Sequence, residues 1–412
     1  MRKIILFIFA CICSVSCWAV EYAPIANLEY IHTAIADKYD ITIQYNPAVT
    51  DITSAANMKY LLTAIDVANT KQGQQTNYGT SEFATEFAAN IITVNTAIDT
   101  LIKSKQDEEE PEEPEPGDEL LTPPYVFGLK TSATNSFSFD IAAKGTYTID
   151  WGDGTIETKP QTSAYTNTYS HTYADSRPRT IRIGGQATEY YYKDTYTQYD
   201  PATISFASRQ NVTEYFGSLG KIFPTMPDGS QPRFLKTFYD NTSLTYVPKK
   251  LFSGITGRPA SFMFYQTFYR CNNLEELPID LFGGLNGAPN THMFYQTFAY
   301  CSKLKYIPER LFGNIHGRPD SNMYYGTFSN CTGLTGEIPL GLFGNLDNYY
   351  RSYMFYQTFY NCRGLTGPSA RMPDGTYLYN YFTTGSGYYY LYYMYSGCTG
   401  LSDYSSIPSN AK

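Results

Sequence analysis

The residues best suited to chemistry in this sequence are its eight cysteines, because thiolates bind metals and thiols form disulfides. Side chains that recur at one place in a repeat point the same way, which suits a disulfide poorly. We therefore expect buried free thiols that pack as small apolar groups, with an occasional disulfide or a metal site as the alternatives. Five cysteines follow one another at intervals of 30, 30, 31 and 36 residues: Cys271, Cys301, Cys331, Cys362 and Cys398.

A group of acids offers a second candidate site. Asp150, Asp153 and Glu157 lie close together in the sequence, at a predicted hairpin, and could bind calcium. The 12-residue calcium loop that ends in a bidentate glutamate is missing, however. We expect these acids to serve the turn and leave calcium binding open.

The four histidines lie far apart in the chain. We expect His171 to make a structural hydrogen bond within a strand, and we expect His292 and His316 on the surface. The sequence contains no H-E-x-x-H, no G-x-S-x-G and no phosphate-binding loop. No nucleophile paired with a base can be identified either. We therefore predict no enzymatic activity, no cofactor and no metal centre.

The charge of the chain is concentrated in one segment. The 412 residues include 38 Asp and Glu against 30 Lys and Arg, for a net charge of −8. Residues 106–119 alone hold nine acids and no base. Because the chain lacks the basic field that binds a phosphate backbone, we expect no nucleic-acid partner. Its 41 tyrosines instead favour a β-rich fold or a binding surface.

The N-terminus predicts export. Cationic residues 2–3, an apolar run over 4–15 and a small-x-small ending at 17–19 follow the order of a secretory signal peptide. We expect cleavage after Ala19, with a lipid anchor at Cys17 as the alternative. No later stretch has the 18 or more apolar residues of a membrane-spanning helix. The sequence therefore predicts a secreted or cell-surface protein.

Five parts follow one another along the chain. After the signal peptide (1–19), residues 20–105 show the apolar spacing of helices, and 106–120 form an acidic Glu/Pro linker. A β-sandwich over 121–207 and a repeat region over 208–412 complete the chain. We expect the helical segment to pack as a small bundle, with self-association through its apolar stripe as the alternative. That stripe consists of Phe83, Phe87, Ile91, Val94, Ile98 and Leu101.

Residues 123–207 alternate polar and apolar side chains with the period of β-strands. Within them, D-W-G-D-G-T at 150–155 precedes S-H-T-Y-A at 170–174 and T-I-R-I at 180–183. These three motifs, in this order, resemble the polycystic-kidney-disease (PKD) type of immunoglobulin-like domain. The resemblance implies a β-sandwich.

The C-terminal half repeats a unit of 30 or 31 residues. A unit has a phenylalanine, a cysteine three residues later (Asn241 in the first copy) and a leucine three residues further on. A proline and a Leu-Phe pair follow in the first four copies. One unit cannot bury its apolar edge alone, whereas stacked units bury these edges against one another. We therefore predict a continuous core and one short strand per unit, at Leu274 to Leu277 in the clearest copy. The ladder of repeated phenylalanines is Phe238, Phe268, Phe298, Phe328 and Phe359.

The T/A-F-x-x-C-x-x-L-x-x-I/L-P pattern over 210–412 resembles the BspA-like leucine-rich repeats of bacterial surface proteins. The unit is longer here than in that family, and the excess falls in a Gly-x-Pro loop. The resemblance implies a leucine-rich-repeat solenoid, attachment to host, matrix or other cells, and no catalysis. The predicted fold class is thus multidomain: a helical N-terminal segment, an immunoglobulin- or PKD-like β-sandwich, and a C-terminal solenoid that is α/β or mostly β.

The residues between the repeated leucine and proline change from unit to unit while the framework stays. A fixed framework with a varied surface is typical of a binding solenoid, and tyrosine supplies contact area together with a hydroxyl. We therefore predict adhesion to, or recognition of, a protein or glycan on host, matrix or other cells. A structural component of the cell envelope is the alternative. The candidate ligand-binding residues are Tyr246, Glu275, Glu276, Lys305 and Tyr306.

Overall fold

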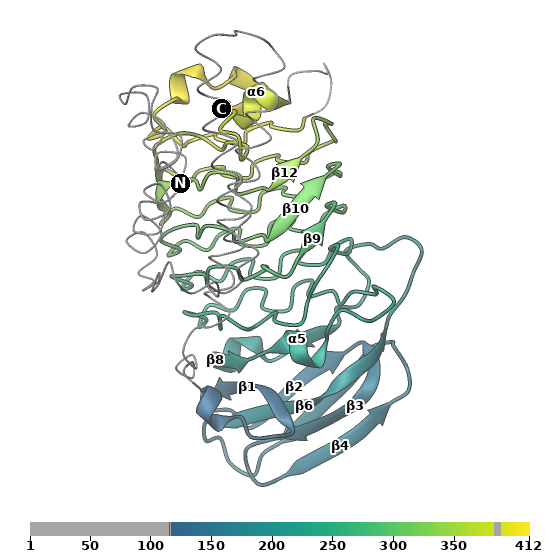
Figure 1. Ribbon diagram of the computed structural model, residues 1–412. Coiled ribbons are helices and arrows are strands. Elements are labelled where there is room, and N and C mark those ends of the chain that lie inside the picture. The colour runs from purple at the N-terminus through teal and green to yellow at the C-terminus, as the bar shows by residue number, and fades with distance from the viewer. Residues whose placement is uncertain (1–114, 116, 383–388) are drawn as a thin grey trace, which may run out of the picture. The chain divides into compact units, whose positions relative to one another are not determined.

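The computed structural model describes residues 115, 117–382 and 389–412 (Figure 1). The expected signal peptide, the expected helical segment and most of the acidic linker lie outside these residues. The chain divides into two compact units, Met1–Glu113 and Pro114–Lys412, and the second contains everything that follows. That unit is mostly β, with antiparallel sheets first and stacked coils with sparse parallel strands after them.

Two antiparallel sheets form the first part of the unit, as the alternating sequence predicted. In β2, Phe137, Phe139 and Ile141 are buried while the residues between them are partly exposed. Contacts such as that of Tyr147 with Tyr169 join the two sheets, at 6.3 Å between ring centroids. One sheet has the order β4 (Ile156–Gln161), β3 (Ala143–Asp150), β6 (Thr180–Tyr190), β1 (Tyr125–Thr131), β8 (Val212–Gly217), and the other β5 (Asn167–Thr172), β2 (Ser136–Ile141), β7 (Ile204–Phe206).

The larger sheet continues past residue 207, where we expected the sandwich to end. The 3-10 helix η2 (Arg209–Asn211) leads into β8, and β8 pairs with β1 along the edge of that sheet. The short helix α5 (Leu219–Ile222) then connects the sheet to the first coil. A short 3-10 helix, η1 (Asp118–Leu120), precedes β1.

Each coil contains a turn-rich segment that bonds to the next coil at every second residue. The backbone N–H of Phe264 donates to the carbonyl of Met293 at 2.8 Å, and that of Phe268 donates to Thr297 at 2.8 Å. The intervening N–H of Thr267 donates back to Phe264 at 3.3 Å. Alternate groups therefore bond between coils and within turns, so the buried backbone is satisfied without a regular strand.

The same segment places two residues inside and two outside in alternation. A residue with positive φ recurs at every fourth position, as at Phe262 (58°) and Gln266 (53°). Between these turns Met263 and Phe264 are buried, and so are Thr267 and Phe268. This four-residue period explains why the M-F-Y-Q-T-F motif has adjacent apolar residues where a strand would alternate them.

The strand that we predicted at Leu274 to Leu277 is absent, which corrects that expectation. A single backbone bond per coil replaces it, as from Glu275 to Thr245 at 3.3 Å, because the following Pro278 has no N–H to continue a ladder. Strands occupy this place only at β11 (Thr335–Glu337) and β13 (Gly364–Thr366) among the described residues, and β11 lies in a unit with one inserted residue. Other described elements of the coils are β9 (Asn286–Gly287), β10 (Asn314–Gly317), β12 (Asn345–Leu346), α6 (Leu378–Tyr381), η3 (Tyr404–Ser406) and η4 (Ser409–Ala411).

Stacked aromatic rings fill the inside of the coils. Phe268 lies 5.1 Å from Phe238 and 5.4 Å from Phe298, centroid to centroid, and the rings are almost parallel. The row continues through Phe328 and Phe359 at 5.5 and 5.7 Å. Both faces of each ring are buried from water, and burial of such a side chain stabilises the fold by about 1.5–3 kcal/mol.

The sandwich and the coils share one core. Phe238 of the first coil packs edge-on against Tyr215 of β8, at 4.7 Å between centroids. The hydroxyl of Thr237 donates to the carbonyl of Ile204 in β7 at 2.8 Å, the same contact that Thr267 makes with the preceding coil. Strand β7 therefore takes the place of a coil before the first one. At the other end, the C-terminal residues bond to the last coil, where the N–H of Tyr395 donates to Ala411 at 2.8 Å.

Candidate functional site

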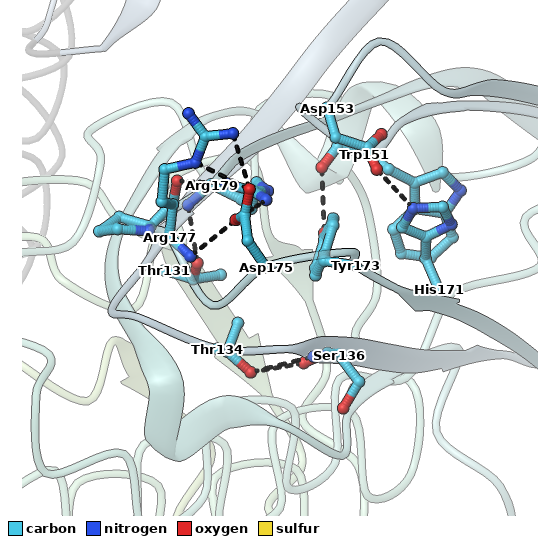
Figure 2. A network of polar contacts seen from close by, with 11 residues as sticks. Thr131, Thr134, Ser136, Trp151, Asp153, His171, Tyr173, Asp175, Arg177 and Arg179 are labelled. Atoms are coloured by element: carbon cyan, nitrogen blue, oxygen red, sulfur yellow. Dashed lines mark hydrogen bonds and ion pairs between the residues drawn. The ribbon is translucent and has the colours of Figure 1, made fainter.

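His171 and one acid of the hairpin, Asp153, belong to a polar network within the sandwich (Figure 2). Trp151 is buried and stacks on His171, 5.3 Å between centroids. The His171 Nε2 lies 2.8 Å from a carboxylate oxygen of Asp153, and the Tyr173 hydroxyl donates to the carbonyl of Trp151 at 3.0 Å. The hydrogen bond with His171 lowers the pKa of Asp153 to about 2. His171 thus makes the structural hydrogen bond that we expected.

The three acids that could have bound calcium each have a different partner. Asp150 pairs with Arg182 at 2.8 Å and accepts the N–H of Gly152 at 2.9 Å. Glu157 pairs with Lys159, and Asp153 faces His171. Within the described ranges, no group of three or more His, Cys, Asp or Glu side chains could hold a metal ion.

The two other described histidines differ in exposure. His316 is exposed, as we expected. His292 is partly buried and stacks on Phe262 at 4.5 Å between centroids, so its expected surface position is wrong. The cause is the turn-rich segment, which brings residues 30 apart in sequence face to face. Burial lowers the pKa of His292.

The five cysteines that the structure describes are buried and free. Each thiol is within hydrogen-bond distance of a carbonyl oxygen in the preceding coil, as between Cys331 and Phe298 at 3.0 Å. Burial raises the pKa of the thiols, to about 12 for Cys331. A thiol that stays protonated is a poor nucleophile and a poor metal ligand, so the row serves packing.

A groove lies across three consecutive coils, on the side of the residues that vary between units. It has a volume of about 520 Å³ and is open to solvent. Tyr246, Glu276 and Tyr306, three of the five predicted ligand-binding residues, line it together. The other lining residues are Val247, Lys249, Leu277, Pro278, Ile279, Ile307, Pro308 and Glu309.

The remaining two predicted residues form an ion pair beside the groove. The Lys305 ammonium lies 2.6 Å from a carboxylate oxygen of Glu275 and 3.6 Å from one of Glu276. The hydrogen bond to Lys305 lowers the pKa of the Glu275 carboxyl, and the same bond raises the pKa of Lys305. These side chains are exposed, so the pair orients Glu276 at the rim and adds little stability.

The sequence reasoning missed the apolar part of the groove. Ile279 is 56% exposed and Tyr306 is 44% exposed, and the two side chains lie together in the groove. The residue after the repeated proline is Lys249, Ile279 and Glu309 in successive coils, so this position varies as the predicted ones do. That variation was visible in the sequence and could have identified these residues.

Tyrosines of the repeated M-F-Y-Q-T-F motif form a separate row on the outside of the turn-rich segments. Tyr295 stacks between Tyr265 and Tyr325, at 4.7 and 4.5 Å between centroids, and Tyr356 continues the row at 4.7 Å. None of these four lines the groove. The row holds the coils in register, because each ring covers the faces of its neighbours.

Comparison with protein-family models, with curated proteins and with solved structures finds no match to the chain. Over the residues that the structure describes, no helix is long and apolar enough to cross a membrane.

Proposed function

We propose that this chain is a non-enzymatic exported surface protein, which recognises a protein or glycan on host, matrix or other cells through the groove of Tyr246, Glu276 and Tyr306. The proposal includes kinship of its repeats with BspA-like leucine-rich repeats and of its sandwich with PKD-type domains. It also includes export by the N-terminal signal peptide. The alternative is that a lipid on Cys17 anchors the exported protein to a membrane.

One observation carries the proposal: the inside of the coils changes little from unit to unit, while the residues that line the groove change at each coil. The inward phenylalanine, threonine and cysteine recur from unit to unit. The groove shows a tyrosine, a glutamate and a tyrosine at the corresponding place of three successive coils. Packing alone does not require that variation, whereas recognition of an asymmetric ligand does.

The physical character of the groove supports binding as well. Exposed Ile279 and the half-exposed tyrosine rings lose water contact when a ligand covers them, and this burial contributes about 25 cal/mol per Å². Tyrosine adds a hydroxyl for specific hydrogen bonds at low entropic cost. The rim carries both signs of charge, through Lys249, Glu276 and Glu309.

An array of glycans and matrix proteins, probed with the full chain, tests the proposal. We expect at least one ligand to bind the wild type and to be lost by the triple variant Tyr246→Ala, Glu276→Ala, Tyr306→Ala. Tyr300→Ala is the matched control, because Tyr300 is 41% exposed yet lies outside the groove. If every ligand that binds the wild type also binds the triple variant equally, the groove is not the recognition site. If no ligand binds the wild type, the proposal of a structural envelope component replaces it.

A further inference from the structure

One end of the groove already holds a carboxylate. Both oxygens of the Glu115 carboxylate accept the backbone N–H of Lys249, at 3.0 and 2.9 Å, across 134 positions of the sequence. Burial first, and then the same Glu115 side chain, raise the pKa of the neighbouring Tyr246 hydroxyl. Lys249 and Tyr246 both line the groove.

We infer that the Lys249 amide and the Tyr246 hydroxyl form a carboxylate subsite, which Glu115 fills in cis and which an acidic residue of an extended partner peptide takes when it binds. This inference rests on the proposed function, because it names the class of ligand for the same groove. A backbone N–H and a phenol are suitable donors, since hydrogen bonds to an ionised acceptor are the stronger kind.

The walls beyond this subsite favour a peptide as the ligand. Tyr246 and Tyr306 give the groove aromatic walls, which are typical of grooves that hold extended chains, and Ile279 adds aliphatic surface. Apolar side chains of a peptide would be buried there without losing any hydrogen bonds. A sugar carries hydroxyls around its rings, and these would lose their hydrogen bonds against proline and isoleucine.

The charges of the groove limit the ligand to one acid near its end. Glu276 and Glu309 lie farther along the groove than Lys249 and Tyr246, in the second and third coils. They would repel a run of acids such as the six in 107–113 of this chain. Glu115 therefore competes only for the subsite, and the partner peptide carries one carboxylate with uncharged apolar residues on one side of it.

Panning a library of random octapeptides against the full-length wild type and the full-length Glu115→Gln variant tests the inference. We expect the variant to enrich peptides with Asp or Glu at one fixed position, followed by Leu, Ile or Pro. A selected peptide should bind the variant about tenfold more tightly than the wild type, as expected if Glu115 occupies the subsite in nine-tenths of the molecules. The matched control is Glu119→Gln, because Glu119 accepts the N–H of Gly117 and does not line the groove. This control should bind like the wild type.

A second variant tests the subsite itself. Tyr246→Phe, made in the Glu115→Gln background, should reduce the preference for the acidic peptide over its amide analogue without changing the melting temperature.

An unchanged preference would overturn the subsite, and so would enrichment of peptides that lack an acidic position. If those peptides, or a ligand from the array, still need Tyr306, the proposed function stands while this inference fails. If nothing that binds depends on Tyr306, both fail. Equal affinity of wild type and Glu115→Gln for an acidic peptide would overturn the competition by Glu115.

Discussion

The thiol of Cys301 lies 3.2 Å from the carbonyl oxygen of Phe268, one coil back, and donates a hydrogen bond to it. The same contact recurs at the four other cysteines of the row, at 2.9 to 3.2 Å. A row of thiols therefore bonds each coil to the one before it, and no thiol of this row is left for a disulfide.

Alkylation should distinguish these thiols from reactive ones. We expect none of the five to react with iodoacetamide in the native protein, because the thiolate is the nucleophile and burial raises the pKa of each thiol. All five should react once urea unfolds the chain. Peptide mapping by mass spectrometry gives the label at each site, and native labelling at several of them would contradict the buried row.

Truncation of one stacked ring should destabilise the whole unit. Phe298→Ala should lower the free energy of unfolding by about 3–5 kcal/mol, because the ring is fully buried between Phe268 and Phe328 and its removal leaves a cavity. The surface variant Tyr300→Ala should cost less than about 1 kcal/mol. Urea denaturation of the two variants measures the difference, and similar costs would show that the row is not the core.

Two buried tyrosines should respond in opposite ways to the loss of their hydroxyl. The Tyr324 hydroxyl is buried without a hydrogen-bond partner among the described residues, in a position where other coils have phenylalanine. Tyr324→Phe should therefore stabilise the protein by about 1–3 kcal/mol. The Tyr395 hydroxyl accepts the N–H of Ala370 at 3.2 Å, so Tyr395→Phe should destabilise it by about 1 kcal/mol. Melting temperatures that move in the same direction would contradict the assignment.

Acid should lower the stability of the sandwich over a defined pH range, through the hairpin residue Asp153. The folded pKa of Asp153, about 2, lies below the ordinary value of 3.8, so its bond with His171 contributes stability above pH 3.8 that is lost as the pH falls toward 2. Asp153→Asn should remove this part of the pH dependence. Urea midpoints between pH 2 and 5 measure it, with Asp140→Asn as the control, since Asp140 accepts a hydrogen bond from the Thr168 hydroxyl at 2.6 Å. Identical acid profiles of Asp153→Asn and wild type would contradict the role of the bond.

The sequence was sufficient for the features that follow from periodicity. Alternation at 136–141 predicted β2, and the 30-residue spacing predicted stacked rings such as Phe268 on Phe298. The sequence did not predict the backbone conformation of Met263 to Phe268. Positive φ angles are usually recognised by a glycine, and here Phe or Gln occupies these positions. The same limit applies to Glu115, whose contact with Lys249 spans 134 positions and depends on how the chain enters the unit.

For the groove, the sequence predicted the variable side chains and missed the walls. Tyr246, Glu276 and Tyr306 were identified because they vary within a constant frame. Pro278 and Pro308 entered the sequence analysis only as repeated positions of the unit, although they also line the groove. The stacking of the coils decides which of the varied residues line the same groove. The spacing of the repeats in the sequence does not determine this stacking.

The central claim is recognition through the groove, and its most direct measurement is the affinity of one array-identified ligand for Tyr306→Ala and for Tyr300→Ala. The two tyrosines are similarly exposed, and of the two only Tyr306 lines the groove. We predict that Tyr306→Ala weakens binding tenfold or more, equivalent to about 1.4 kcal/mol, while its melting temperature and the affinity of Tyr300→Ala stay at the wild-type values. Equal affinity of the two variants for every ligand would contradict the account.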